Sequence, residues 1–128
     1  ELEKVSNFYE TEPIPKSNQA MYVNGVVSVK TNFLPKKILS ELMNIEKIFK
    51  RVRHFKNESR VIDLDLLCYN EIILKDKHLQ LPHPRMHLRR FVMQPLCDIN
   101  KEWVHPILKE KAKNILKKLA NQKIYNIN

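Results

Sequence analysis

The segment RVIDLDLLCY, residues 60–69, combines the pattern of a strand with a pair of carboxylates. Apolar residues alternate with Asp63 and Asp65, and this period of two predicts a strand over residues 60–69. Both carboxylates then leave one face of the strand and repel each other unless a cation offsets their charge. A magnesium ion with phosphate ligands suits such a pair. An exposed strand face paired with lysines is the alternative.

Outward from this segment, the chain alternates predicted strands and helices. Upstream strands are expected at residues 5–11 and 21–30, joined by a Pro-containing loop over 12–20. A helix is predicted from Pro35 to Phe49, with an apolar stripe at Ile38, Leu42, Ile45 and Phe49. Downstream, we expect a short strand at 71–74, a rigid turn at 82–84, and helices at 86–96 and 106–120, the last with Leu108, Ala112, Ile115 and Leu119 facing inward. This order predicts one α+β domain with an antiparallel sheet.

Composition excludes several classes of protein. The 128 residues suit a single domain, and the one glycine, Gly25, is too few for a Walker-type or dinucleotide-binding loop. Cys68 and Cys97 match no zinc or redox spacing and are expected to be reduced. Because no apolar run approaches the length of a membrane span, we expect a cytoplasmic protein with no membrane partner. The formal charge of +9 leaves a nucleic-acid partner open.

Other side chains stand out as candidates for chemistry. Glu46 lies inside the apolar stripe of its helix, so it needs hydrogen-bond donors from a ligand, from Arg51, or from solvent at the stripe edge. Tyr22 and Asn24 share a strand face that could hold a flat heterocycle, or that is simply solvated. His83 lies in a Pro-His-Pro turn and could meet a phosphate or cap the turn. The arginines, whose planar forks suit phosphate, all lie in the middle of the chain at Arg51, Arg53, Arg60, Arg85, Arg89 and Arg90.

Taken in order, these elements resemble the family of 6-hydroxymethyl-7,8-dihydropterin pyrophosphokinases, enzymes of folate synthesis. The elements that carry the resemblance run from Phe8 to Pro106 and include Phe8-Tyr9-Glu10-Thr11, Tyr22-Val23-Asn24, Arg51-Val52-Arg53, Arg60-Val61-Ile62-Asp63-Leu64-Asp65, Leu81-Pro82-His83-Pro84-Arg85 and Arg89-Arg90-Phe91. The resemblance implies a ferredoxin-like α+β sandwich, an antiparallel sheet with helices on both faces. It also implies transfer of a diphosphoryl group from ATP to the pterin, with release of AMP.

The resemblance further implies roles for individual residues. Asp63 and Asp65 would hold two Mg²⁺ ions, and Arg51 and Arg60 would act with them as catalytic residues. The pterin pocket would consist of Thr11, Ile14, Tyr22, Asn24 and Phe91. The ATP side would consist of Glu46, Arg53, Arg60, Leu66, His83 and Arg89. A monomer with no nucleic-acid partner is expected.

The sequence departs from the family pattern in the loop between Arg53 and Arg60 and at its N-terminus. No tryptophan stands between Arg53 and Arg60, and Glu58-Ser59 replaces the usual Gly-Pro. The family's first strand and helix have no counterpart, so residues 1–128 are expected to form a domain that is incomplete at its N-terminus. Two alternatives therefore stay open: an inactive truncated relative, and a basic ferredoxin-like domain that binds nucleic acid.

Overall fold

The computed structural model describes residues 1–11, 22–51 and 62–128 of the chain, with the side chain of Arg51 left out. Two compact units are present: unit 1 contains Glu1–Thr31 and Pro84–Asn128, and unit 2 contains Asn32–His83. Strands pair antiparallel in both units, which confirms the predicted α+β class with antiparallel pairing. Among the described residues, no helix is long and apolar enough to cross a membrane.

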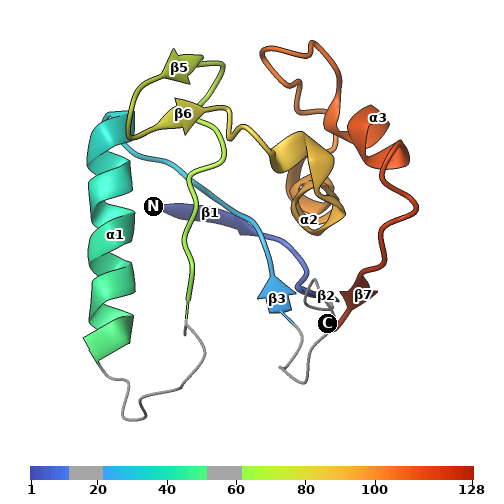
Figure 1. Cartoon of the computed structure of the whole chain (residues 1–128), viewed down its shortest axis with the longest axis horizontal. Coiled ribbons are helices and arrows are strands. Elements are labelled where there is room, and N and C mark those ends of the chain that lie inside the picture. The colour runs from blue at the N-terminus through green and yellow to red at the C-terminus, as the bar shows by residue number, and fades with distance from the viewer. Residues whose placement is uncertain (12–21, 52–61) are drawn as a thin grey trace. The chain divides into compact units, whose positions relative to one another are not determined.

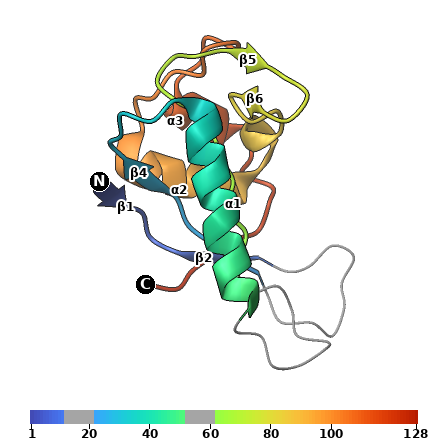
Figure 2. The same cartoon turned by 90° about the vertical axis from the view of Figure 1, so that its left-hand side faces the viewer.

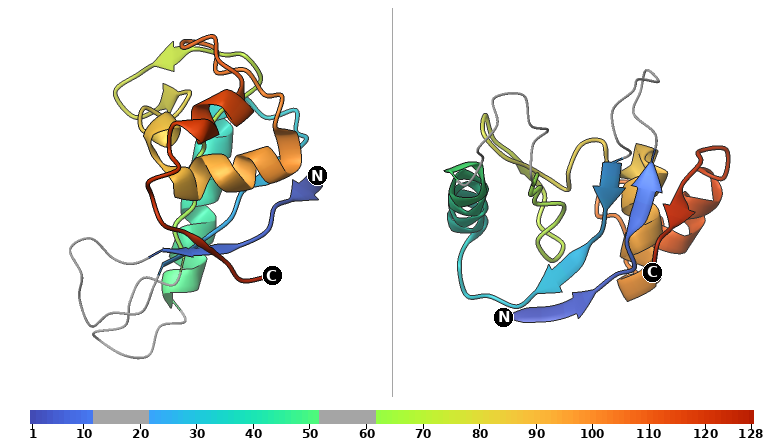
Figure 3. Two further views of the ribbon diagram at one scale, coloured as in Figure 1. Left: turned by 90° about the vertical axis from the view of Figure 1, so that its right-hand side faces the viewer. Right: turned by 90° about the horizontal axis from the view of Figure 1, so that it is seen from below.

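The strands of unit 1 form two small sheets. In one, β1 (Leu2–Val5) pairs with β4 (Val27–Val29). In the other, β2 (Tyr9–Thr11) lies between β3 (Tyr22–Asn24) and β7 (Tyr125–Asn126), as the right-hand view of Figure 3 shows. The sequence pattern gave no sign of β7, because two residues are too short to show a period.

Each of the two long predicted strands of unit 1 is broken into shorter pieces. Ser6 stands at one break, where its backbone N–H donates to the carbonyl of Val26 at 2.9 Å. Its hydroxyl accepts from the N–H of Val26 at 2.8 Å, so the two breaks hold each other. Gly25 is required beside them, because a Cβ on it would lie 2.6 Å from the Phe8 ring.

Helices of unit 1 carry most of its core. The predicted helix over 86–96 is instead a 3-10 turn, η1 (Met86–Leu88), followed by α2 (Arg90–Asn100), which continues through Pro95. The expectation that this helix ends near Pro95 is therefore wrong. Met93, Pro95 and Leu96 are all buried, and the packing of this face offsets the hydrogen bond that proline cannot donate.

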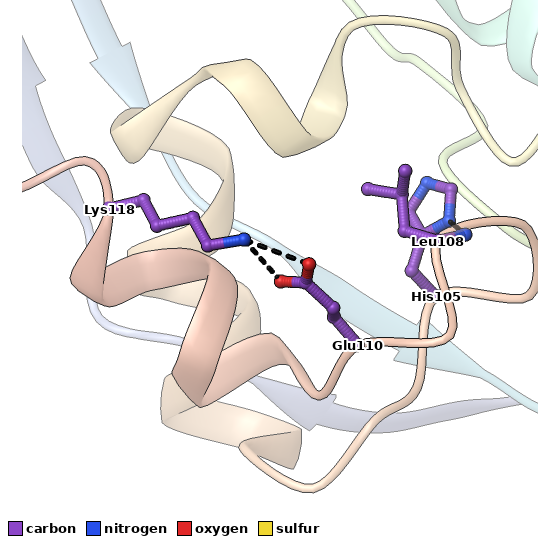
Figure 4. A network of polar contacts seen from close by, with 4 residues as sticks. All are labelled: His105, Leu108, Glu110 and Lys118. Carbon is purple, nitrogen blue, oxygen red and sulfur yellow. Dashed lines mark hydrogen bonds and ion pairs between the residues drawn. The ribbon is translucent and has the colours of Figure 1, made fainter.

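The last helix, α3 (Ala112–Lys117), is much shorter than the predicted helix over 106–120. Ala112, Ile115 and Leu119 are buried as expected. Leu108 is 41% exposed, contrary to the prediction, because residues 105–110 form a loop in which Lys109 has a φ of 59°. Figure 4 shows this loop, in which His105 contacts Leu108. An ion pair joins Glu110 of the loop to Lys118, the residue directly after α3.

The described part of unit 2 contains one helix, one hairpin and an extended segment. The helix α1 (Pro35–Arg51) confirms the predicted helix and runs two residues further. The hairpin pairs β5 (Leu74–Lys75) with β6 (Gln80–Leu81), in place of the strand expected at 71–74. Figures 1 and 2 both show the hairpin near the N-terminal end of α1, where Lys36 forms an ion pair with Asp76 at 2.7 Å.

The predicted strand over residues 60–69 is wrong for its described part. Residues 62–69 belong to no strand, although exposure alternates with a period of two over residues 62–66. This segment instead runs beside α1 in the opposite direction, as Figure 1 shows. Glu46 contacts it near one end through Leu64, and the Tyr69 hydroxyl donates to the carbonyl of Phe33 at the other end. Among the described residues, these contacts tie the segment to α1 and to the stretch that precedes it.

Candidate active site

Asp63 and Asp65 lie on the outer side of the extended segment of unit 2. Both are exposed, whereas Ile62, Leu64 and Leu66 between and beside them are half-buried. The alternation that was predicted for a strand thus survives over residues 62–66, because successive side chains of extended backbone point to opposite sides. The two carboxylates are presented together on one side.

Glu46 of α1 finds its hydrogen-bond donor in the residue between these two aspartates. Its Oε2 accepts the backbone N–H of Leu64 at 2.8 Å in a half-buried position. The sequence predicted that this carboxylate needs a donor and left a ligand, Arg51 or solvent at the stripe edge as candidates. The structure shows a backbone donor instead, and the side chain of Arg51 lies outside the described residues.

The turn that carries His83 lies against the other end of the same segment. The backbone N–H of His83 donates to the carbonyl of Leu67 at 2.7 Å. The preceding residues Leu81 and Pro82 are buried, and their peptide bond is cis. Within unit 2 the structure therefore brings Glu46, Leu66 and His83 to the segment that carries both aspartates.

The predicted pterin residues that are described all belong to unit 1. Thr11 of β2 is buried and pairs directly with Tyr22 of β3, which is 55% exposed. Asn24 of β3 is half-buried and pairs with Tyr9. At the start of α2, the Arg89 guanidinium lies 5.5 Å from the centre of the Phe91 ring, within the range of a cation–π contact.

Some predicted site residues fall outside the described residues. These are Ile14, Arg53 and Arg60, together with the side chain of Arg51.

Sequence reasoning missed a cavity of about 280 Å³ in unit 2, between α1 and the β5–β6 hairpin. Its lining includes Leu39, Met43 and Leu79 as apolar residues and Asn44 as an amide. Leu39 and Glu46 are seven residues apart, so two turns of helix place them on the same side of α1.

The predicted stripe placed Ile45 and Phe49 inward, but they are 40% and 41% exposed. The intermediate exposure of Leu39, Leu42 and Glu46 marks the true inner side.

Local charges and burial shift several pKa values near these elements. Lys36 and the backbone N–H of His78 lower the pKa of Asp76, which lies at the hairpin. Burial raises the pKa of the Cys68 thiol to about 11, so it stays un-ionised at neutral pH. In unit 1, burial and the hydrogen bond to Asp98 at 2.6 Å raise the pKa of Tyr9 to about 12. Tyr9 is therefore a neutral hydrogen-bond donor that joins β2 to α2.

The donor set of the aspartate pair fits magnesium. Among the described residues, no group of three or more His, Cys, Asp or Glu side chains could hold a metal ion. Magnesium does not need such a cage, since one or two carboxylates commonly bind it together with substrate phosphates and water. Two exposed carboxylates on one side of an extended chain meet that requirement.

Comparison with known proteins assigns the chain to a family. The family model described as 7,8-dihydro-6-hydroxymethylpterin-pyrophosphokinase (HPPK) matches residues 1–101. The 2-amino-4-hydroxy-6-hydroxymethyldihydropteridine pyrophosphokinase of Aquifex aeolicus is 38% identical over 113 residues, which are 88% of this chain and 71% of that protein. The protein of the same name from Haemophilus influenzae is 36% identical over 130 residues, which cover 99% of this chain and 79% of that protein. The chain belongs to the HPPK family.

Relatives of a second kind are much longer than this chain. The folic acid synthesis protein fol1 of Pneumocystis carinii is 39% identical over 104 residues, which are 81% of this chain but only 14% of that protein. The match to a small part of a long folic acid synthesis protein agrees with the resemblance to a folate enzyme.

Proposed function

We propose that the chain transfers the diphosphoryl group of ATP to the hydroxymethyl oxygen of 6-hydroxymethyl-7,8-dihydropterin and releases AMP. The observation that carries this proposal is the exposed Asp63 and Asp65 pair, held by α1 in a chain of the HPPK family. The relatives from Aquifex aeolicus and Haemophilus influenzae are named as pyrophosphokinases of this pterin.

In this reaction the hydroxymethyl oxygen forms a bond to the β-phosphorus of ATP. The bond from that phosphorus to the oxygen shared with the α-phosphorus breaks, and its electron pair leaves with AMP. The hydroxyl proton is lost to solvent. Transfers of this kind depend on positioning and on stabilised charge, not on a covalent nucleophile. We assign Arg51 and Arg60 as the cations for charge on the transferred group.

Asp63 and Asp65 would hold Mg²⁺, and we propose two ions. Bound Mg²⁺ neutralises phosphate charge and orients the β-phosphorus for attack. The exposed, same-sided placement of the two carboxylates supports this role. Among the described residues they are not part of a larger acidic cluster.

The substrates are assigned to different sets of residues. On the ATP side we propose Glu46, Arg53, Arg60, Leu66, His83 and Arg89. Three of these, Glu46, Leu66 and His83, lie on the same segment or contact it in unit 2. For the pterin we propose Thr11, Ile14, Tyr22, Asn24 and Phe91, of which Thr11 and Tyr22 are direct partners across β2 and β3.

The cavity beside α1 is our proposed position for the adenine ring. A volume of about 280 Å³ accommodates a purine, and the apolar side chains of Leu39, Met43 and Leu79 offer contacts to its faces. The amide of Asn44 can pair with its edge.

Finer features of the protein are part of the same proposal. We propose a ferredoxin-like arrangement for the α+β fold, a monomer as the active form, and the cytoplasm as its location. The family assignment supports each of these.

Substitution of the aspartates tests the proposal. Asp63→Asn and Asp65→Asn each remove one negative charge from an exposed side chain, so folding should be unaffected while AMP formation falls by at least ~10²-fold. AMP is measured by chromatography with ATP, the pterin and Mg²⁺ present, and pterin binding is measured in parallel by its fluorescence.

Glu71→Gln is the matched control, because Glu71 is an exposed carboxylate of the same unit. It should leave AMP formation unchanged. Full activity in either aspartate variant would refute the assignment of the metal carboxylates. A loss of pterin binding equal to the loss of AMP formation would also contradict it.

A further inference from the structure

Glu46 contacts the backbone between the two aspartates and neither aspartate side chain. The acceptor is its Oε2 and the donor is the N–H of Leu64, 2.8 Å away. A hydrogen bond with one charged partner is among the stronger ones in proteins, particularly where both groups are shielded from water. Glu46 and Leu64 are both half-buried, so this contact is partly shielded.

This contact holds the backbone of an extended segment. Residues 62–69 are extended but belong to no strand among the described residues. An extended segment without a ladder is free to shift or rotate unless other contacts hold its backbone. Here Glu46 holds the segment at Leu64, and the N–H of His83 holds it at the carbonyl of Leu67.

The position of the hydrogen bond at Leu64 determines which side chains it can restrain. Leu64 is adjacent to both Asp63 and Asp65, and neighbouring Cα atoms are about 3.8 Å apart. A contact at Leu64 therefore restrains both carboxylates with a single hydrogen bond. It also keeps Leu64 turned toward α1, which leaves the aspartates on the exposed side.

We infer that Glu46 is a positioning residue, which fixes the geometry of the Asp63 and Asp65 carboxylates for a divalent cation through the N–H of Leu64. This inference rests on the proposed function and specifies how Glu46 serves the ATP side. The role belongs to the carboxyl oxygen as a hydrogen-bond acceptor at a given reach. The negative charge of Glu46 strengthens the hydrogen bond, but the bond does not require it.

Two conservative substitutions of Glu46 test separately the length of its side chain and its negative charge. Glu46→Gln keeps the length of the side chain and an oxygen acceptor for Leu64, but removes the charge. Glu46→Asp keeps the charge but is one methylene shorter, so it cannot reach Leu64 from an unchanged helix. The matched controls are Glu41→Gln and Glu41→Asp, because Glu41 lies on the same helix and pairs with Lys37 near the surface.

The experiment measures Mn²⁺ binding to the full chain by electron paramagnetic resonance, with a non-hydrolysable ATP analogue present. Hydrogen exchange of the peptide that contains Leu64 is measured on the same samples. The Gln variant should bind Mn²⁺ nearly as tightly as the unsubstituted chain. The Asp variant should bind it at least ~10-fold more weakly, as is typical when support of a metal ligand is lost. Its Leu64 peptide should also exchange faster.

The opposite order of the two variants would overturn the inference, because it would show that the charge of Glu46 matters and its reach does not. Unchanged Mn²⁺ affinity in the Asp variant would overturn it as well. AMP formation by the unsubstituted chain is assayed separately. If no AMP forms while the Mn²⁺ affinities follow the expected order, the proposed reaction fails and the positioning role stands.

Discussion

His105 offers the sharpest test of how unit 1 is held together. The residue is 3% exposed, and its Nδ1 accepts the backbone N–H groups of Ile107 and Leu108 at 3.2 and 3.1 Å. Each hydrogen bond contributes a net ~0.5–1.5 kcal/mol, so the pair contributes ~1–3 kcal/mol. His105→Ala also leaves a cavity beside the rings of Trp103 and His87, which lie about 5.6 and 5.5 Å away. The loss of stability should be at least as large as the hydrogen-bond contribution.

The same contacts make the stability depend on pH. Burial, and then the neighbouring His87, lower the pKa of His105 below its usual 6.5, while Glu110 acts in the opposite direction. Below pH 6.5 the unfolded chain binds a proton that the folded chain resists, so the free energy of unfolding falls as the pH falls. The slope from one such group reaches at most ~1.4 kcal/mol per pH unit. This fall in stability stops once the pH is below the pKa that His105 has in the folded chain.

Urea unfolding followed by circular dichroism at pH 8.0, 7.0, 6.0 and 5.5 measures both effects. Glu102 does not interfere in this range, because Lys113 and Lys111 lower its pKa from 4.5 to about 2 and its contribution changes only at lower pH. The unsubstituted chain should lose stability from pH 7.0 to 5.5, and the Ala variant should lose less. Equal slopes in the two proteins, or rising stability toward acid, would refute the reasoning.

Three further predictions follow from particular contacts. Met93→Ala removes a fully buried side chain of α2 and should lower the free energy of unfolding by ~2–5 kcal/mol in urea titrations, whereas Leu108→Ala at a 41% exposed position should change it far less. Met43→Trp should fill the cavity beside α1 and raise the KM for ATP while the KM for the pterin stays constant; equal changes in both would contradict the adenine assignment. Binding to RNA without magnesium should be weak at every salt concentration, and a steep salt dependence would favour the nucleic-acid alternative.

The sequence predicted α1 well because it is long and regularly amphipathic. Seventeen residues from Pro35 to Arg51 form it, and proline at the start fits the first turn. Its inner side was predicted less well. Leu39 and Glu46 face inward where Ile45 and Phe49 were expected, because the segment packed on α1 contributes the donor that Glu46 needs.

The sequence pattern did not predict the short elements or the places where tertiary contacts decide the local structure. The alternation around Asp63 and Asp65 is real, but a period of two does not reveal whether an extended chain pairs with a strand or with a helix. Likewise, the helical period from Pro106 onward could not show that His105 holds residues 107 and 108 in a loop. In both places a side chain binds backbone N–H groups, and periodicity does not record such contacts.

The central claim is most directly tested by phosphorus NMR of a reaction containing the chain, ATP, Mg²⁺ and 6-hydroxymethyl-7,8-dihydropterin. We expect AMP and the pterin diphosphate to appear in equal amounts, with no ADP, and we expect both to require the pterin. Formation of ADP with a pterin monophosphate, or breakdown of ATP that is independent of the pterin, would contradict the account.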